Sequence, residues 1–338
     1  MMFNKNIIII ILMLIGLNLS SQDIHFSQFG MSPLNLNPAF TGFFDGDYRG
    51  VANYRSQWTT VPVSYSTTSL SFDTKRAIKG NSLNNFGAGL LFNNDVSGDS
   101  RYGITQLYLP LSFNKTTGKD STIFFGFGVQ PGVSNIGFRT SRLTYDNQWD
   151  GDAYNPALPT GENYPILKRT YFDLNIGGMF QMFVTHSSVL TFGLSMSHLT
   201  SPKVSFFKND EIKLDQKIHS YLAYRIAFSP KINLQTEYLF QKQGEFMENV
   251  IGARFSYVIN VAEKQAVSAG GYYRAKDAVI ARIGYDVKQW QFGVSYDVNN
   301  SAFKAATNRR GAIEFAVIYI FKQSSIFIPK KRSCPVFM

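Results

Sequence analysis

The sequence has a single cysteine, Cys334, among its 338 residues. One cysteine excludes an intrachain disulfide and a metal site built from clustered cysteines. Charged residues are scarce as well, at 17% of the chain against roughly 25% in a typical soluble domain. The surface that has to be kept in water is therefore small for a chain of this length.

Long apolar runs are also lacking. After residue 20, no run approaches the roughly 20 apolar residues that a membrane-spanning helix needs, and the mean hydropathy is −0.10. These two facts exclude a helical membrane protein. Disorder is excluded in turn, because 30 Phe and 18 Tyr are too much apolar surface for an unfolded chain. The class that fits best is a β protein with one face in lipid and the other in water.

Residues 1–21 have the pattern of a secretory signal peptide. Lys5 supplies the positive start, Ile7 to Leu17 form the apolar stretch, and Leu19-Ser20-Ser21 close it with small polar residues. An apolar stretch of about 11 residues is too short for a retained membrane anchor. No cysteine lies at the cut, so a bacterial lipoprotein has nothing to acylate. We therefore expect an exported chain.

Between Tyr48 and Phe321, apolar and polar residues alternate with a period of two in segments of about ten residues. In segment 231–241, Leu234 and Tyr238 fall on one face while Gln235 and Glu237 fall on the other. Such segments predict about fourteen strands, an even number as bacterial single-chain barrels require. They lie near 48–57, 64–73, 85–93, 101–113, 121–131, 168–181, 188–198, 218–228, 231–241, 249–259, 264–274, 277–287, 289–299 and 309–321.

A soluble β-sandwich also alternates, but two features favour a barrel in a membrane. The apolar face is aromatic at the strand ends, as lipid-interface girdles are, and the polar face carries charges at mid-strand, which suits a wet lumen. The charges expected to face the lumen are Arg55, Asp173, Arg225, Glu237, Arg254, Arg282, Asp286 and Glu314. We predict an all-β fold, a transmembrane antiparallel β-barrel over residues 48–321, in the bacterial outer membrane.

The lengths of the connections predict which end of the barrel faces outward. With a periplasmic N-terminus, the outward connections include the longest two, 132–167 and 199–217, together with 300–308. Long loops outside and short turns inside are the expected asymmetry. The connection 74–84 is a long exception on the inward side.

The two ends of the mature chain lie outside the strand pattern. Residues 22–47 are rich in aromatics, Asn and Pro. The segment is too irregular to form a membrane-spanning strand and too apolar to remain exposed to water. We expect this segment to pack at the periplasmic mouth of the barrel. Residues 322–338 are a basic tail that contains proline. We expect it on the periplasmic side, where it either lies across the lumen floor, contacts a periplasmic partner or is disordered.

No arrangement of residues indicates catalysis, a cofactor or a metal. The nearest thing to a nucleophile elbow, Gly193 to Ser197, lacks the closing glycine and lies inside a strand pattern. The four histidines share no metal-ligand spacing and are interpreted as surface or girdle residues. The net charge of +10 is spread along the chain, which argues against a nucleic-acid partner. We predict a non-enzymatic protein.

Several motifs, taken in order, resemble the PorP/SprF family of the type IX secretion system of Bacteroidetes. They are His25-Phe26-Ser27-Gln28-Phe29, Pro33-Leu34, Leu36-Asn37-Pro38-Ala39-Phe40-Thr41-Gly42, Tyr54-Arg55-Ser56-Gln57-Trp58, Gly193-Leu194-Ser195-Met196-Ser197-His198-Leu199, Lys242-Gln243-Gly244, Tyr273-Arg274-Ala275-Lys276-Asp277-Ala278 and Phe292-Gly293-Val294-Ser295-Tyr296-Asp297. The chain closes with Cys334-Pro335-Val336-Phe337 where the family often has Cys-Pro-Arg-Phe. Val336 thus departs from the family pattern, and so does the extra Met338.

The resemblance implies a non-enzymatic barrel that assists secretion or surface attachment of a cognate adhesin, which in gliding members is SprB-like with a type-B C-terminal domain. The implied partners are that adhesin, other type IX components and outer-membrane lipid. Family-motif residues suited to a plug or docking element are His25, Phe26, Ser27, Gln28, Phe29, Pro33, Asn37, Pro38 and Gly42. A general outer-membrane diffusion pore is the alternative. A barrel lipase is a third reading, which would need a Ser–His pair on the lipid face.

Overall fold

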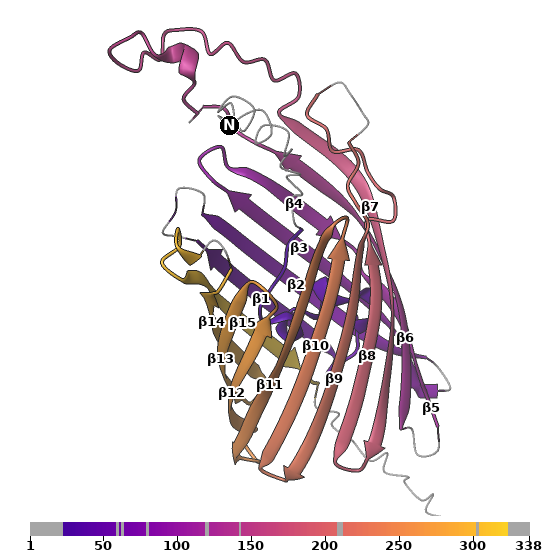
Figure 1. Ribbon diagram of the computed structural model, residues 1–338. Helices are drawn as coiled ribbons and strands as arrows, with labels where there is room; N and C mark the ends of the chain where they lie inside the picture. Colours follow the sequence, from indigo (N-terminus) through magenta and orange to yellow (C-terminus); the bar gives the residue numbers. More distant parts are fainter. Residues whose placement is uncertain are drawn as a thin grey trace, which may run out of the picture.

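The computed structural model describes residues 23–58, 61, 64–78, 81–118, 122–141, 143–207, 212–301 and 304–323. The expected signal peptide lies outside the described residues, as do residues 324–338 of the tail with Cys334. The described chain forms one closed antiparallel β-barrel around an N-terminal segment, drawn in indigo in Figure 1.

Fifteen strands of the described residues build the wall. They are β1 (Tyr48–Gln57), β2 (Tyr65–Ile78), β3 (Asn81–Ser97), β4 (Tyr102–Tyr108), β5 (Leu111–Thr117), β6 (Ile123–Gly137), β7 (Lys168–Thr185), β8 (Ser188–Ser197), β9 (Lys217–Ser229), β10 (Ile232–Gln243), β11 (Phe246–Asn260), β12 (Gln265–Arg274), β13 (Ala278–Val287), β14 (Trp290–Asn299) and β15 (Arg310–Phe321).

The wall closes because its first and last strands pair. β1 runs antiparallel to β15, with Tyr48 opposite Phe321 and Gln57 opposite Ala312. Strands β4 and β5 both lie between β3 and β6 in one continuous register. Together they occupy one strand position of the barrel. That strand is interrupted at Pro110, which has no N–H to donate to the ladder. With β4 and β5 counted as one strand, the described barrel has fourteen strands. This confirms the predicted fold class and the predicted number of strands.

Each predicted segment contains a strand. The prediction that residues 74–84 form a long connection is wrong. β2 continues to Ile78 and β3 begins at Asn81. Lys75 and Arg76, which have the composition of a turn, instead pair with Gly87 and Phe86 of β3. The exception to the loop asymmetry therefore disappears.

The two ends of the barrel differ. β1 begins and β15 ends at one end, called here the terminal end, where the strands are joined by short turns such as Val287 to Trp290. The opposite end, called the loop end, carries the connections 138–167, 198–216 and 300–309. The longest of these, between β6 and β7, includes η4 (Asp146–Gln148) and extends away from the rim (Figure 1).

The outward face of the wall is apolar. Ile283 and Phe127 are 63% and 57% exposed. The inward face, by contrast, carries buried Asn, Gln, Ser and charged residues such as Asn53 and Gln130. A soluble sandwich would bury its apolar face, so this inverted distribution is that of a barrel in lipid.

The N-terminal segment lies inside the lumen. It contains three short helical turns: η1 (Phe29–Met31), α2 (Pro33–Leu36) and η2 (Pro38–Phe40). Asp23 contacts Lys217 and His198 at the loop end, and Gly42 contacts Asp73 toward the terminal end. Residues 23–42, called the plug below, thus run through the lumen. The segment was expected to pack at the periplasmic mouth, and its path extends beyond that mouth to the loop end. No helix among the described residues is long and apolar enough to cross a membrane.

Candidate functional site

The apolar side of the plug packs on inward-facing apolar residues of the wall. Phe29 meets Tyr221 and Tyr272 edge-on, with ring centroids 6.0 Å apart in both pairs, and Phe40 meets Tyr221 in the same way. The buried cluster that forms here contains Phe29, Leu36, Ala39, Phe40, Met179, Tyr221, Ala223, Leu239, Val250, Tyr272 and Ile280. Each large apolar side chain contributes about 1.5–3 kcal/mol when fully buried, so this cluster holds the plug firmly.

Asn37 fastens the middle of the plug to β7 and β8. Because Pro38 follows it, Asn37 is extended, with φ −163° and ψ 126°. Its side-chain oxygen accepts the Ala39 N–H at 2.8 Å and caps η2. Its side-chain nitrogen donates to the carbonyl oxygens of Gly178 and Leu194, at 2.9 and 3.1 Å. The Asn-Pro turn is thus both a local cap and a bridge to the wall.

Glycines of the wall let the plug backbone approach closely. A Cβ added at Gly128 would lie 2.4 Å from the carbonyl carbon of Pro38, and one added at Gly177 would lie 2.1 Å from Oδ1 of Asn37. Neither distance is possible for a real Cβ without movement. Only glycine therefore fits where the wall meets the turn at Pro38.

We expect Gly128→Ala to destabilise the plugged barrel by about 1–3 kcal/mol, the usual cost of overpacking. The methyl group would meet rigid backbone of Pro38 and Ala39. Gly178→Ala is the matched control, because the nearest atom to its Cβ, the Gly126 carbonyl oxygen, is 3.8 Å away. Urea unfolding of the two variants measures the difference. Equal midpoints would mean that the plug does not lie against β6.

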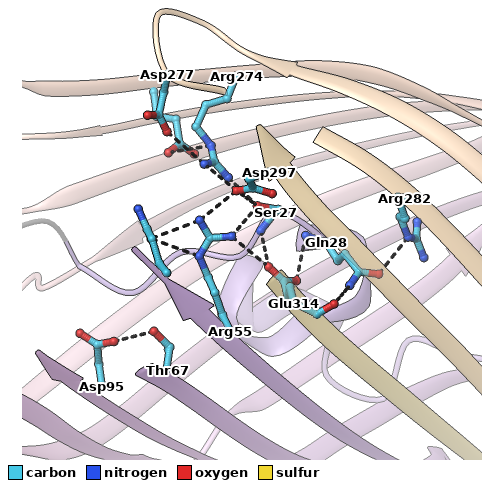
Figure 2. A network of polar contacts seen from close by, with 12 residues as sticks. Ser27, Gln28, Arg55, Thr67, Asp95, Arg274, Asp277, Arg282, Asp297 and Glu314 are labelled. Carbon is cyan, nitrogen blue, oxygen red and sulfur yellow. Dashed lines mark hydrogen bonds and ion pairs between the residues drawn. The ribbon is translucent and has the colours of Figure 1, made fainter. Parts of the chain in front are cut away.

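A network of buried charges holds the start of the plug, and it is called the Ser27 network below (Figure 2). Its members are Ser27, Gln28, Arg55, Arg274, Asp297 and Glu314. The backbone N–H groups of Ser27 and Gln28 donate to the two carboxylate oxygens of Glu314, at 2.8 and 3.0 Å. The Ser27 hydroxyl donates to Asp297 at 2.7 Å.

Two arginines complete this network. Arg55 donates to the Ser27 hydroxyl at 2.6 Å and pairs with Asp297 at 3.0 Å and Glu314 at 3.3 Å. Arg274 donates to the same hydroxyl at 2.7 Å and pairs with Asp297 at 3.2 Å. Buried charges are tolerated only when they are paired and hydrogen-bonded. Since the plug supplies three of these hydrogen bonds to carboxylates, it is an integral part of the lumen.

The opposite end of the plug is held by a second ion pair. Arg49 contacts Asp73 in a two-pronged arrangement, with Nε to Oδ1 at 2.9 Å and Nη2 to Oδ2 at 2.8 Å. This geometry is the strong form of the interaction. Arg49 also donates to the Phe40 carbonyl oxygen, and Asp73 accepts the Gly42 N–H, at 2.9 and 2.8 Å. The plug is therefore anchored at both ends.

At the loop end, His198 joins the plug to β7. Its Nδ1 lies 2.6 Å from Asp173 Oδ2, and its Nε2 lies 3.2 Å from Asp23 Oδ2. Burial alone would lower the pKa of His198, but the hydrogen bonds to Asp173 and Asp23 raise it to about 9. His198 is consequently a cation at neutral pH.

We expect the loop-end anchor to weaken in alkali. Because the pKa of His198 is raised in the folded chain, its contribution is complete below its ordinary value of 6.5 and is lost as pH rises through about 9. Proteolysis near Asp23 should therefore speed up between pH 7.5 and pH 10. His198→Gln has no charge at either pH and is the control, in which the rate should change much less. An identical pH response in both proteins would rule out His198 as the anchor.

The lumen charges expected from the sequence differ in burial. Arg55, Asp173, Glu237, Arg282 and Glu314 are buried, Arg254 and Asp286 are half-buried on the same face, and Arg225 is exposed. Of the motif residues, Phe26, Ser27, Gln28, Phe29, Asn37, Pro38 and Gly42 lie in the plug among wall residues, Pro33 begins α2, and His25 is half-buried.

Sequence reasoning missed several residues that the structure brings together: Arg49, Asp73, His198, Arg274 and Asp297. Three of them, His198, Arg274 and Asp297, stand inside motifs quoted above, which was the available signal. Arg49 and Asp73 carry no such signal, because each is a single polar residue in an ordinary alternation. Among the described residues, no group of three or more His, Cys, Asp or Glu side chains could hold a metal ion.

Comparison with known proteins finds a family and a fold. The family model described as "Type IX secretion system membrane protein PorP/SprF" matches residues 18–319. A sequence comparison with curated proteins finds no significant match.

Among solved structures, a deltaS2 mutant of the TodX monoaromatic hydrocarbon channel is 11% identical, with a TM-score of 0.53 over 86% of this chain and 94% of that one. A Pseudomonas aeruginosa FadL homologue is 12% identical, with a TM-score of 0.50 over 84% and 93%. The Pseudomonas putida toluene transporter TodX is 11% identical, with a TM-score of 0.50 over 89% and 95%. At these identities the likeness shows the barrel fold alone.

Proposed function

This chain belongs to the PorP/SprF family of type IX secretion system membrane proteins, and we propose that it assists, without catalysing a reaction, the secretion or surface attachment of a cognate adhesin. The family is one of membrane proteins and the fold is that of outer-membrane barrels. The chain is accordingly an outer-membrane protein, and its partner has to act at one of the two ends of the barrel.

The observation that carries the proposal is the filled lumen. Phe29, Leu34 and Ala39 of the plug are at most 4% exposed, and wall residues from β1 to β15 contact the plug. A general diffusion pore requires a water path, which this packing occupies. The surface left for a partner is the rim and not the lumen.

The loop end offers apolar residues of the kind that protein partners bind. Trp149 and Tyr154 lie opposite each other in the connection between β6 and β7, and Phe207 and Ile212 lie in the connection between β8 and β9. All four are exposed. Exposed apolar residues set among polar ones are a feature of protein-binding surfaces. We assign this rim to the client, a SprB-like adhesin with a type-B C-terminal domain whose display supports gliding.

A diffusion pore remains the second candidate, because the barrels of similar fold include proteins named as hydrocarbon channels. The plug argues against a diffusion pore, because it fills the lumen through which a solute would have to pass. The two candidates differ in whether the lumen conducts and in whether a secreted protein binds the rim.

Recovery of the client from its own outer membrane tests the proposal. The tagged barrel should retrieve one secreted multi-domain protein, and the double variant Trp149→Ser, Tyr154→Ser should lose it. Val261→Ser is the control, because Val261 is 67% exposed at the terminal end and should retrieve the client normally. Normal adhesin display in a strain without this barrel would contradict the proposal.

The lipid face gives a separate prediction. Ala269 of β12 points outward between Phe255 and Ile283, whereas Ser268 points into the lumen beside Gly284. Ala269→Arg should cost about 2–4 kcal/mol, the cost of arginine near the bilayer midplane. Ser268→Arg, the adjacent control, keeps its charge in the lumen and should fold better. Folded fractions in lipid vesicles measure both, and equal fractions would mean that the facing is wrong.

A further inference from the structure

A cavity of about 230 Å³ lies at the loop end between the start of the plug and strands β1 to β4. Its wall includes Trp58, Tyr65 and Tyr102, which stand at the loop-end termini of β1, β2 and β4. Cavities of about 150 Å³ hold benzene, so this one can take a side chain or a small molecule. It cannot take a folded domain.

One carboxylate in this cavity has no cation. Asp95 of β3 accepts a hydrogen bond from the Thr67 hydroxyl at 2.5 Å, and no basic side chain of the described chain pairs with it. Figure 2 shows this pair standing apart from the Ser27 network. The buried carboxylates Asp73, Asp297 and Glu314, by contrast, each have an arginine partner. Glu237 also lacks a basic partner in the described chain, but it accepts hydrogen bonds from Tyr221, Tyr272 and Gln235, whereas Asp95 accepts one, from Thr67.

The arginines nearest to Asp95 already have carboxylate partners. Arg55 also lines the cavity, but its guanidinium is taken up by Asp297, Glu314 and Ser27. Arg274 faces Glu248 and Asp277 in addition to Asp297. Neither arginine is available to Asp95, so a cation that pairs with Asp95 displaces no existing ion pair.

The aromatic wall suits the same ligand. The rings of Trp58 and Tyr65 pack edge to face on each other, with centroids 5.5 Å apart at 84°, and both line the cavity. Tyr102 lines the same cavity. Ring faces attract ammonium and guanidinium groups within about 6 Å. A carboxylate beside aromatic rings is therefore a receptor for an organic cation.

We infer that this cavity binds a primary ammonium or guanidinium group entering from the loop end, with Asp95 as its counter-ion and Trp58, Tyr65 and Tyr102 around its alkyl stem. Such a group comes either from a lysine or arginine side chain of another protein or from a free amine. The inference does not depend on the proposed function, because it concerns a ligand of the barrel itself.

Calorimetric titration of the purified full chain in detergent tests the inference. N-acetyl-lysine methylamide should bind saturably, and its uncharged analogue N-acetyl-norleucine methylamide should not. Asp95→Asn should weaken lysine binding at least about tenfold, since hydrogen bonds to charged groups are the stronger kind. Asp99→Asn, in the exposed turn after β3, is the control and should bind as the wild type does.

Putrescine distinguishes the two sources of the cation. If it binds as tightly as the lysine amide, a free amine is a sufficient ligand, and if it binds at least about tenfold more weakly, the cavity selects a protein side chain. Both results support the inference. Absence of saturable binding by any cation would overturn it, and so would equal affinities in wild type and Asp95→Asn. The norleucine comparison stands whether or not the Asp95 variant folds.

Discussion

Deleting residues 24–40 should leave a barrel that still inserts but leaks small solutes and no longer displays its client. Insertion should persist because β1 pairs with β2 and β15 along its whole length without help from the plug. Leakage should appear because the deletion removes Phe29, Leu36 and Ala39 from the lumen. Water would then solvate the charges that the plug now pairs. Sensitivity of cells to an antibiotic too large for ordinary porins, together with surface labelling of the adhesin, measures the two effects.

A deletion in the loop separates leakage from loss of display. Removing residues 146–158, between β6 and β7, takes away Trp149 and Tyr154 but leaves the plug intact. This variant should lose client display without becoming leaky. Normal display and normal permeability after removal of 24–40 would mean that the N-terminal segment is neither plug nor docking element.

Glu314→Ala should be the most destabilising single substitution in the Ser27 network, at about 3–5 kcal/mol, which is the cost of breaking a buried ion pair. Glu314 is fully buried and accepts two backbone N–H groups of the plug while it pairs with Arg55. Its loss leaves the two buried N–H groups without an acceptor and removes one of the two carboxylates that pair with Arg55. Urea unfolding measures the change, with the exposed Glu245→Ala as control, which should lie within about 0.5 kcal/mol of wild type.

The cost of Glu314→Ala should also depend on the plug. In the chain without residues 24–40, water reaches Arg55, and the plug N–H groups are gone. The same substitution should then cost much less than in the full chain, which is the coupling expected of residues in contact. If Glu314→Ala costs the same in both backgrounds, the plug does not close the lumen over this network.

The wall could be predicted from the sequence because its signal is local. Period-two alternation along β10, with Leu234 outward and Gln235 inward, is readable without knowing any neighbour. The even strand number agreed with a bacterial barrel, and the outward aromatics with the mid-strand charges indicated lipid on one face and water on the other. The connection 74–84 failed because Lys75 and Arg76 look like turn residues, whereas their pairing with β3 is decided by tertiary contacts.

The path of the plug could not be predicted, because its contacts join distant parts of the chain. Asn37 bonds to Gly178 and Leu194, and Ser27 bonds to Glu314. The sequence did contain one overlooked sign, namely inward apolar residues such as Leu239 and Ile280. Apolar side chains that point into a water-filled lumen would be unfavourably exposed, whereas an apolar plug buries them. His198 was interpreted as an ordinary surface or girdle residue, because nothing local places it between Asp173 and Asp23.

The central claim is that the plug fills the lumen, so that a partner binds at the rim. The most direct test is the conductance of the wild-type barrel in planar lipid bilayers at neutral pH. The expected result is insertion without a steady open-state current, and a clear current from the chain lacking residues 24–40 under the same conditions. A large, steady conductance from the wild-type barrel would contradict the filled lumen and favour a diffusion pore.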